Sequence, residues 1–330
     1  IPEKTKIDGQ DISTIDPIPF GHKVCLKPIN KGDPIIKYDQ IIGFASKNIN
    51  AGEHVHSHNL EFKEFERNFK VNNKKTIVDE NVDTFFNGIL RENGQVATRN
   101  YIGIVSTVNC SATVTKMIVE KIKYSNILND YPNIDGIVPI THSTGCGMNT
   151  VSEGMQMFQR TIDGFKNHPN FSHVFVIGLG CECAQVSLFD ESVKKHNRIH
   201  FLTIQDEGGT KKIVEKVLSQ IKNLLSEAND IKRTPEPVSH LTLALQCGGS
   251  DGYSGITANP ALGVAADMLV KKGGSSILSE TPEIYGAEHL LINRANSQET
   301  ADKLMKRLEW WKHYTSINNS TMDNNCLLYT

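Results

Sequence analysis

From Asn100 onward, apolar segments rich in β-branched residues alternate with segments of helical periodicity, and this alternation constrains the fold more than any other feature. Strands buried on both faces of a parallel sheet are apolar along their whole length, whereas covering helices are apolar on one face. The pattern predicts mostly parallel, Rossmann-like α/β units. The expected strands are 101–107, 136–140, 174–179, 199–204, 241–245 and 276–279, and the expected helices are 113–123, 150–165, 211–227, 260–271 and 287–294.

Residues 1–60 consist of short apolar segments separated by turn sequences, which predicts a small all-β module. Its expected strands are 22–26, 35–38 and 41–45. Residues 61–80 are rich in Lys, Glu and Asn and predict a linker with at most a short helix. The charged segment 230–238 contains two prolines and predicts a boundary between two α/β units. We therefore expect a β domain at 1–62, a linker at 63–85, a central α/β domain at 86–232 and the start of a C-terminal α/β domain at 238–330.

The net charge and the cysteine content limit the kinds of partner and the cellular compartment that we expect for this protein. A formal net charge of -2 argues against a nucleic-acid-binding or polybasic membrane surface. No apolar run approaches the roughly 20 residues that span a bilayer, and no secretory signal pattern follows Ile1. Seven cysteines at long spacings favour free, metal-bound or catalytic thiols in a reducing cytoplasm. We expect a small-molecule partner, no nucleic-acid or membrane partner, and a homodimer as a candidate assembly.

Cysteines follow four of the predicted strands at the point where each strand ends. They are Cys110, Cys146, Cys181 and Cys247, with Cys183 two residues after Cys181. Ligands of open α/β sheets bind at the carboxyl ends of the strands, so these thiols are expected to form part of a functional site. The same loops add acidic and imidazole groups, namely His142, Glu182, Asp251 and Glu280.

A thiol-rich site of this kind has two chemical interpretations. Sulfur ligands with nearby carboxylates suit iron or zinc, whereas a single cysteine with His142 as its base suits covalent catalysis. Nicotinamide and ATP chemistry are poorly supported, because the sequence has no GxGxxG or GxxxxGK[ST] motif. The alternative to a functional site is a purely structural role, in which the small residues Cys and Gly are present because they fit tight turns between strands and helices.

Residues 246–260 form the densest polar loop of the sequence and contain four glycines. Asn259 is the expected N-cap of the following helix, with Pro260 in its first turn. Backbone donors and the dipole at a helix N-terminus can bind a carboxylate, and an ordinary flexible turn is the alternative. The expected substrate contacts in this loop are Gly248, Gly249, Ser250, Ser254, Thr257 and Asn259.

A second polar cluster lies in the N-terminal module, where His54, His56 and His58 alternate along the chain. Alternate residues of an extended segment share one face. Three imidazoles on one face, with His22 from an earlier strand, are expected to bind a sugar acid or a metal. A solvated, His-rich edge strand is the alternative.

At these residues the sequence resembles the altronate/galactarate dehydratase family. The N-terminal part resembles the family's SAF (β-clip) domain at 21–23, 36–38, 42–43 and 52–59, and the main body is similar at 98–101, 109–111, 142–147, 178–182, 247–260 and 280–283. The most specific piece is CGGSDGYSGITANP, at 247–260. The three imidazoles of 54–58 resemble the altronate type more than the galactarate type.

The resemblance implies a hydro-lyase that removes water from a hexonic or hexaric sugar acid, such as altronate, to give a 2-keto-3-deoxy acid. It implies a divalent metal, with Fe2+ expected and Mn2+ or Mg2+ as alternatives. The cation would stabilise an enediolate while a base removes the α proton, and a general acid would protonate the departing hydroxyl. The implied catalytic residues are His142, Cys146, Glu182 and Asp251, and the candidate metal ligands are Cys110, Cys146, Cys181, Cys247 and Glu280.

The sequence departs from the family pattern at Asp39, at Ala97, which replaces a usual Gly before Thr98, and at its ends. Asp39 stands where the family usually has Gly, which is expected to alter only a turn. The lack of an initial Met and the change of pattern after Asn325 lead us to expect a chain cut short at both ends, with an incomplete site. Two other functions therefore stay open: a non-catalytic sugar-acid-binding fragment, and a cysteine-dependent transferase or redox enzyme that uses Cys146 or Cys247.

Overall fold

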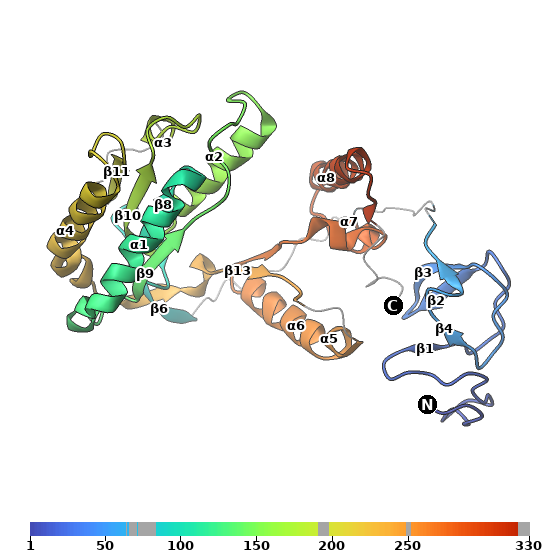
Figure 1. Cartoon of the computed structure of the whole chain (residues 1–330). Coiled ribbons are helices and arrows are strands. Elements are labelled where there is room, and N and C mark those ends of the chain that lie inside the picture. The colour runs from blue at the N-terminus through green and yellow to red at the C-terminus, as the bar shows by residue number, and fades with distance from the viewer. Residues whose placement is uncertain (64, 66–70, 72–83, 191–197, 249–251, 323–330) are drawn as a thin grey trace. The chain divides into compact units, whose positions relative to one another are not determined.

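A computed structural model describes residues 1–63, 65, 71, 84–190, 198–248 and 252–322 (Figure 1). The chain forms two compact units. Unit 1 combines Ile1–Val82 with Leu241–Thr330, and unit 2 is Asp83–His240. No helix among these described residues is long and apolar enough to cross a membrane.

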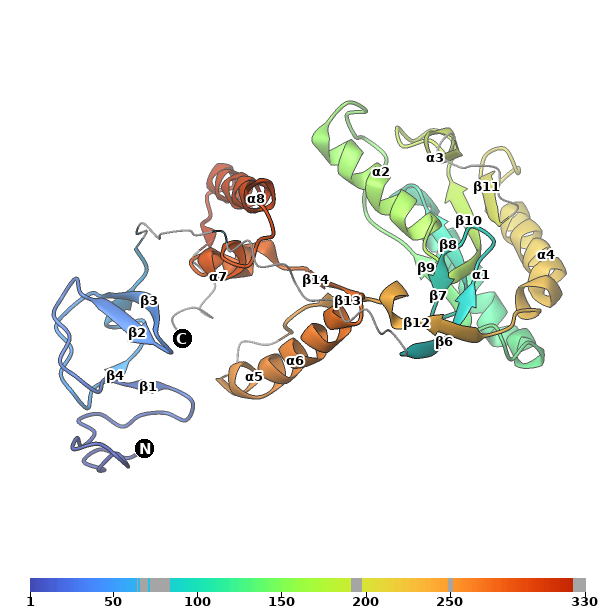
Figure 2. The ribbon, with the colours of Figure 1, turned by 180° about the vertical axis from the view of Figure 1, so that it is seen from behind.

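Unit 2 contains a parallel sheet with helices on both faces, which confirms the predicted α/β class. Its strand order is β11-β10-β8-β9. The views in Figures 1 and 2 place α4 and α2 on opposite sides of this sheet. The strands are β8 (Tyr101–Ser106), β9 (Gly136–Ile140), β10 (Phe171–Gly178) and β11 (Ile199–Thr203), and the helices are α1 (Asn109–Ser125), α2 (Glu153–Lys166), α3 (Ser187–Asp190) and α4 (Thr210–Asn229).

Alternate residues of the strands supply two separate apolar cores. On β10, Phe175 and Ile177 pack with buried residues of α1 and α4. Val174 and Val176 point to the opposite face and pack with Phe158 and other residues of α2. Every residue of β10 is buried, so burial on both faces explains why its sequence is apolar without alternation.

Unit 2 also has a small antiparallel sheet that the sequence did not predict. Its strands are β6 (Phe85–Leu90), β7 (Val96–Ala97) and β12 (Thr234–Pro237), in the order β12-β6-β7. The segment 230–238, interpreted from its prolines as a boundary, therefore contains a strand paired with β6. Pro235 and Pro237 are tolerated because β12 is an edge strand, where a missing N–H need not break a ladder.

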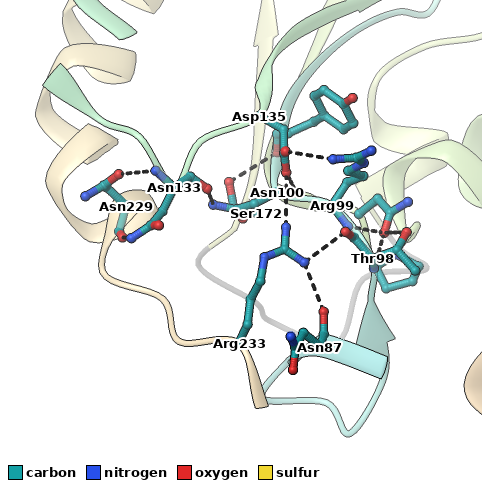
Figure 3. A network of polar contacts seen from close by, with 12 residues as sticks. Asn87, Thr98, Arg99, Asn100, Asn133, Asp135, Ser172, Asn229 and Arg233 are labelled. Carbon is teal, nitrogen blue, oxygen red and sulfur yellow. Dashed lines mark hydrogen bonds and ion pairs between the residues drawn. The ribbon is translucent and has the colours of Figure 1, made fainter. Parts of the chain in front are cut away.

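A polar network fastens the amino-terminal edge of the parallel sheet (Figure 3). The Asp135 carboxylate accepts a 2.6 Å hydrogen bond from the Asn100 backbone N–H and forms ion pairs with Arg99 at 3.4 Å and Arg233 at 3.7 Å. Arg233 also donates to the carbonyl oxygens of Asn87 and Thr98 at 3.2 and 3.1 Å. The segment leading into β12 is thereby joined to β6 and to the start of β8.

The N-terminal part of unit 1 consists only of strands, turns and isolated bridges among its described residues, in agreement with the predicted all-β module. Cys25, Ile35, Ala45 and Leu60 belong to its small core. The strands are β1 (Lys23–Val24), β2 (Pro34–Lys37), β3 (Gln40–Ala45), β4 (His54–Val55) and β5 (Leu60–Glu61). β1 pairs with β4, and β3 lies between β2 and β5.

The later part of unit 1 contains a parallel strand pair, β13 (Thr242–Leu245) and β14 (Ser275–Leu278), connected through helices. The 20-residue helix α8 was not predicted, and its only described buried residues are Ala301 and Leu308. The remaining helices are α5 (Gly252–Ile256), α6 (Ala258–Lys271), α7 (Glu288–Ile292) and α8 (Gln298–Ile317), and short 3-10 turns occur at Ile127–Asp130, Val238–His240 and Thr281–Ile284.

Candidate functional site

The carboxyl end of the unit 2 sheet brings three cysteine-bearing loops together. They follow β8, β9 and β10 and carry Cys110, Cys146 and the pair Cys181 and Cys183. The chain leaves β8 toward β9 on one side and β10 lies on the other, so β8 and β10 flank a topological switch point. Open α/β sheets bind ligands at such a point.

Backbone hydrogen bonds fasten these loops to one another. The Asn109 N–H donates to the Thr144 carbonyl oxygen at 2.9 Å, which joins the start of α1 to the loop after β9. The Cys183 N–H donates to the Cys146 carbonyl oxygen at 3.2 Å, and the Ala184 N–H donates to Gly145 at the same distance. The three loops therefore form one supported surface.

Glu182 supports the same surface from within. Its side chain is buried, and Oε1 accepts hydrogen bonds from the Thr107 hydroxyl at 2.9 Å and the Leu179 N–H at 3.1 Å. Oε2 accepts from the Gly180 N–H at 2.6 Å. These contacts join the loop after β10 to the end of β8, so Glu182 holds the loops in place. Its implied part in catalysis stays a prediction.

Gly145 allows the loop after β9 to approach the end of β8. A Cβ atom at this position would lie 2.3 Å from the Thr107 carbonyl oxygen and 2.9 Å from the Val108 Cα, and the φ angle of Gly145 is +97°. Both the space and the backbone conformation exclude a larger residue. The motif was recognised in the sequence, but the contact with Thr107 depends on a residue 38 positions away and has no local signal.

The four thiols of this edge are exposed and close enough to influence one another. The thiols of Cys146 and Cys110 are hydrogen-bonded. The pKa of Cys146 is raised, first by the negative charge of the Cys110 thiolate, then by desolvation, and then by the thiolates of Cys181 and Cys183. Removing protons from these groups therefore accumulates negative charge, which a bound cation would offset.

A single metal ion finds no ready site among the described side chains. No three His, Cys, Asp or Glu residues in the described part of the chain are arranged to hold one. The donor set of unit 2 is nevertheless rich in sulfur, which suits iron or zinc and is a poor match for Mg2+. The predicted ligands Cys247 and Glu280 belong to unit 1.

His142 already uses both of its ring nitrogens in hydrogen bonds. Nε2 lies 2.8 Å from the Ser106 carbonyl oxygen, and Nδ1 accepts a 3.2 Å hydrogen bond from the Thr144 N–H. These partners assign the proton to Nε2. The ring packs edge-on against Phe158, with centroids 4.7 Å apart. A transfer of a proton to substrate would require exchange of one of these hydrogen bonds.

In unit 1, Cys247 and Glu280 meet at the ends of β13 and β14. The Cys247 N–H donates to the Glu280 carboxylate at 2.9 Å, so the side chain of Glu280 closes the loop after β13. Gly248 lies in this loop, whereas Gly249, Ser250 and Asp251 lie outside the described residues.

The predicted helix start in this region was wrong. α6 begins at Ala258 with Thr257 at the N-cap position, so Asn259 is inside its first turn and is not the cap. Ser254 lies in the short helix α5. The Thr257 hydroxyl donates to the Tyr253 carbonyl oxygen at 2.8 Å. Among the described residues of the polar loop, 246–248 are irregular, whereas 252–256 and 258–260 are helical.

The imidazoles of the N-terminal module do gather, although the chain is extended only at His54 and Val55 and turns at 56–59. Asn59 stabilises this turn, because its side chain accepts from the His56 N–H at 3.0 Å and donates to the His54 carbonyl oxygen at 2.9 Å. The His54 ring lies 5.6 Å from that of His56 and 5.3 Å from that of His58.

His22 completes this group, which we call the imidazole quartet (His22, His54, His56 and His58). Its Nδ1 lies 2.9 Å from the Nε2 of His54, and its ring stacks on that of His56 at 4.9 Å. Desolvation and then the charge of His22 lower the pKa values of His54 and His56, which favours neutral rings. The pairing of β1 with β4 brings His22 to the others.

The fold and the thiol-bearing edge define a Rossmann-like α/β protein with an N-terminal β module. Family models match the altronate/galactarate dehydratase SAF domain at 1–63, the D-galactarate dehydratase/altronate hydrolase second domain at 88–229, and the D-galactarate/altronate dehydratase C-terminal domain at 238–327. The chain belongs to the altronate/galactarate dehydratase family, as its sequence motifs indicated.

Individual relatives agree with this assignment. Altronate dehydratases of Bacillus subtilis and Escherichia coli are each 33% identical to the chain, over 328 and 320 residues. Galactarate dehydratase (L-threo-forming) of Escherichia coli is 34% identical over 322 residues. Each comparison covers 94% of this chain, and the chain spans 61–62% of the length of these relatives.

Proposed function

We propose that this chain belongs to a hydro-lyase that converts a hexonic or hexaric sugar acid, such as altronate, to its 2-keto-3-deoxy acid with the help of a divalent metal. The observation that carries the proposal is the similarity to two altronate dehydratases and one galactarate dehydratase across 94% of the chain. The convergence of thiols at the ligand-binding edge of the unit 2 sheet supports it independently.

The reaction needs a cation, a base and an acid. The metal would supply stabilisation of the enediolate that forms when the α proton leaves. We propose Fe2+, because sulfur donors predominate at this edge. Mn2+ and Mg2+ are the alternatives that the family resemblance implies, and the sulfur donors disfavour Mg2+. His142 is our candidate acid/base, and it would exchange its hydrogen bond to Thr144 or Ser106 for one to the substrate.

We propose that groups of unit 1 bind the substrate. Neutral imidazoles of the quartet can accept hydrogen bonds from sugar hydroxyls and donate to a carboxylate, which suits a polyhydroxy acid. Gly248, Ser254, Thr257 and Asn259, which follow β13 in the chain, are our further candidates for contacts with the substrate. We propose a cytoplasmic enzyme with a small-molecule partner, no nucleic-acid or membrane partner, and a homodimeric assembly.

The decisive experiment is an anaerobic assay of the full chain with Fe2+ against altronate, galactarate and related acids, with detection of the 2-keto-3-deoxy product. Product from at least one acid is expected. His142→Gln should lower kcat by about a hundredfold or more, whereas His313→Gln, on the exposed surface of α8, should leave it unchanged. No product with any acid, together with binding of the same acids, would favour a non-catalytic sugar-acid-binding role.

A further inference from the structure

The amino-terminal edge of the unit 2 sheet carries two half-buried guanidinium groups that form no ion pair with a carboxylate of the described residues. They belong to Arg91, directly after β6, and Arg198, directly before β11. We propose that these two side chains, together with His168, form a binding site for a dianionic oxyanion of the phosphate class. The site lies at the opposite end of the parallel strands from the cysteine-bearing loops, so it goes beyond the proposed function.

The two guanidinium groups flank one short segment, the connection from α2 to β10. Arg91 Nε donates to the Pro169 carbonyl oxygen at 2.8 Å, and Arg198 Nη1 donates to the Phe171 carbonyl oxygen at 2.9 Å. These acceptors are two residues apart in the chain, so they lie within about 7 Å of each other. The hydrogen bonds therefore hold both planar cations at the same place on this edge.

His168 adds a neutral donor in the same connection. Its Nδ1 accepts a 3.1 Å hydrogen bond from the Asn170 N–H, which assigns the ring proton to Nε2. Burial and then the charge of Arg198 lower the pKa of His168, so its ring lies within electrostatic range of that guanidinium group. An anion beside Arg198 could accept from this ring as well.

Each guanidinium group keeps N–H donors for a ligand, since it has five in all. The hydrogen bonds of Arg91 to Pro169, Arg99 and Asn100 use its Nε and Nη2 atoms, and that of Arg198 uses Nη1. Nη1 of Arg91, and Nε and Nη2 of Arg198, have no hydrogen-bond partner within the described part of the chain. Planar donors of this kind match the oxygen atoms of a phosphate group.

The neighbouring arginines show what these two lack. Arg99 and Arg233 share the Asp135 carboxylate in the network of Figure 3. Burial, and then the positive charges of Arg198 and Arg233, lower the pKa of Arg91 to about 10. Half-buried cations that repel one another are costly unless an anion compensates them. A dianion would offset both charges, whereas a single carboxylate would offset one.

A buried imidazole near the pair also lacks a partner. His173, two residues along β10 from Phe171, is 8% exposed, and its Nδ1 has no hydrogen-bond partner among the described residues. The charges of Arg91 and Arg198 reach this ring, since they contribute, after burial and His200, to the lowered pKa of His173. A bound dianion would reduce the positive potential at this ring too.

The test is isothermal titration calorimetry of the full chain at about pH 8, where phosphate is a dianion. Inorganic phosphate, glucose 6-phosphate and acetate are compared at constant ionic strength. Saturable binding of phosphate is expected, with acetate about tenfold weaker or more because it carries one charge. Arg91→Gln and Arg198→Gln should each weaken phosphate binding about tenfold, and Arg198→Lys, which keeps the charge, should weaken it less. Arg160→Gln, exposed on α2, is the matched control and should bind phosphate like the native sequence.

Hydrogen exchange locates the bound anion, because phosphate should slow exchange of the amides of 167–171 and leave those of β13 unchanged. Circular dichroism of each variant checks that it folds. Tighter binding of glucose 6-phosphate than of inorganic phosphate would support the site with a phosphorylated metabolite as its ligand, and equal binding would support it with free phosphate. Three results would overturn the proposal: no saturable binding of either phosphate, equal affinities for phosphate and acetate, or folded Arg91→Gln and Arg198→Gln variants that bind phosphate like the native sequence.

Discussion

Asp39 occupies a conformation that its side chain disfavours. Tyr38 and Asp39 have φ angles of 52° and 61° and form the two-residue turn between β2 and β3. Two positive φ angles define a type I′ hairpin turn, where glycine is preferred. Asp39→Gly should raise the free energy of unfolding of this module by about 0.5–1 kcal/mol, and Asp39→Ala should lower it. Hydrogen exchange of the β2–β3 amides measures both, and equal effects of Gly and Ala would contradict the turn assignment.

Replacement of Glu182 should destabilise unit 2, because its carboxylate accepts three hydrogen bonds and donates none. Glu182→Gln keeps the shape but turns an NH2 group toward backbone donors. The loss should be about 2 kcal/mol in the free energy of unfolding of unit 2. Chemical denaturation followed by hydrogen exchange of β10 is the measurement. Glu120→Gln, exposed on α1, is the matched control, and equal stability of the two variants would show that Glu182 does not support the loops.

At the scale of elements, burial decided which parts of the fold the sequence revealed. β8 and β10 were predictable because residues buried on both faces must be apolar throughout. β12 was not, because an edge strand tolerates the charges and prolines that usually mark a boundary. α8 has only two described buried residues, so its periodicity is weak. The candidate site was predictable to a similar extent. The predicted strand ends indicated that the cysteine-bearing loops share one edge of the sheet, but the contacts of Glu182 and Gly145 that hold these loops together depend on tertiary structure.

Asn100 connects several elements, so among these substitutions we expect its replacement to lower the free energy of unfolding most. It is fully buried, and its Nδ2 donates to the carbonyl oxygens of Asn133 and Ala228 at 2.9 and 2.8 Å. Its Oδ1 accepts from Arg91 at 3.0 Å. Asn100→Ala removes all three hydrogen bonds, including the buried one to the Ala228 carbonyl oxygen, and should cost about 3 kcal/mol in the free energy of unfolding.

The control for Asn100→Ala is Asn223→Ala, on the exposed face of α4, where the exchange of Asn for Ala should be neutral or slightly stabilising. Denaturant titration monitored by far-ultraviolet circular dichroism compares the two variants. A cost below about 1 kcal/mol for Asn100→Ala would mean that the amino-terminal edge of the sheet does not depend on this amide.

At the scale of the whole molecule, the two units can be followed separately. Both tryptophans of the chain, Trp310 and Trp311, lie on α8 in unit 1, so their fluorescence reports unit 1. Hydrogen exchange of β8 and β10 amides reports unit 2. This separation matters because both units contain imidazoles with lowered pKa values. The pH dependence expected of unit 2, where the buried His173 stacks on the half-buried His200, must be measured apart from that of His54 and His56 in unit 1.

Burial, and then the charges of His200, Arg91 and Arg198, lower the pKa of His173 to about 4. Burial also lowers the pKa of His200. His173 Nδ1 and His200 Nε2 are buried without a hydrogen-bond partner among the described residues, so both rings are accommodated as neutral groups. The unfolded chain binds a proton at His173 below pH 6.5, whereas the folded chain does so only near pH 4. The stability of unit 2 should therefore be constant above pH 6.5 and fall between pH 6.5 and 4, by about 3 kcal/mol from His173 alone.

Hydrogen exchange of β10 at several pH values, corrected for intrinsic exchange rates, tests this expectation. His173→Phe keeps an aromatic ring beside His200 and should remove most of the slope between pH 6.5 and 4. His313→Phe, on exposed α8, should leave the slope of unit 2 unchanged. An unaltered slope in His173→Phe would assign the acid sensitivity of unit 2 to other groups. A parallel loss of tryptophan fluorescence in every variant would show that the two units unfold together.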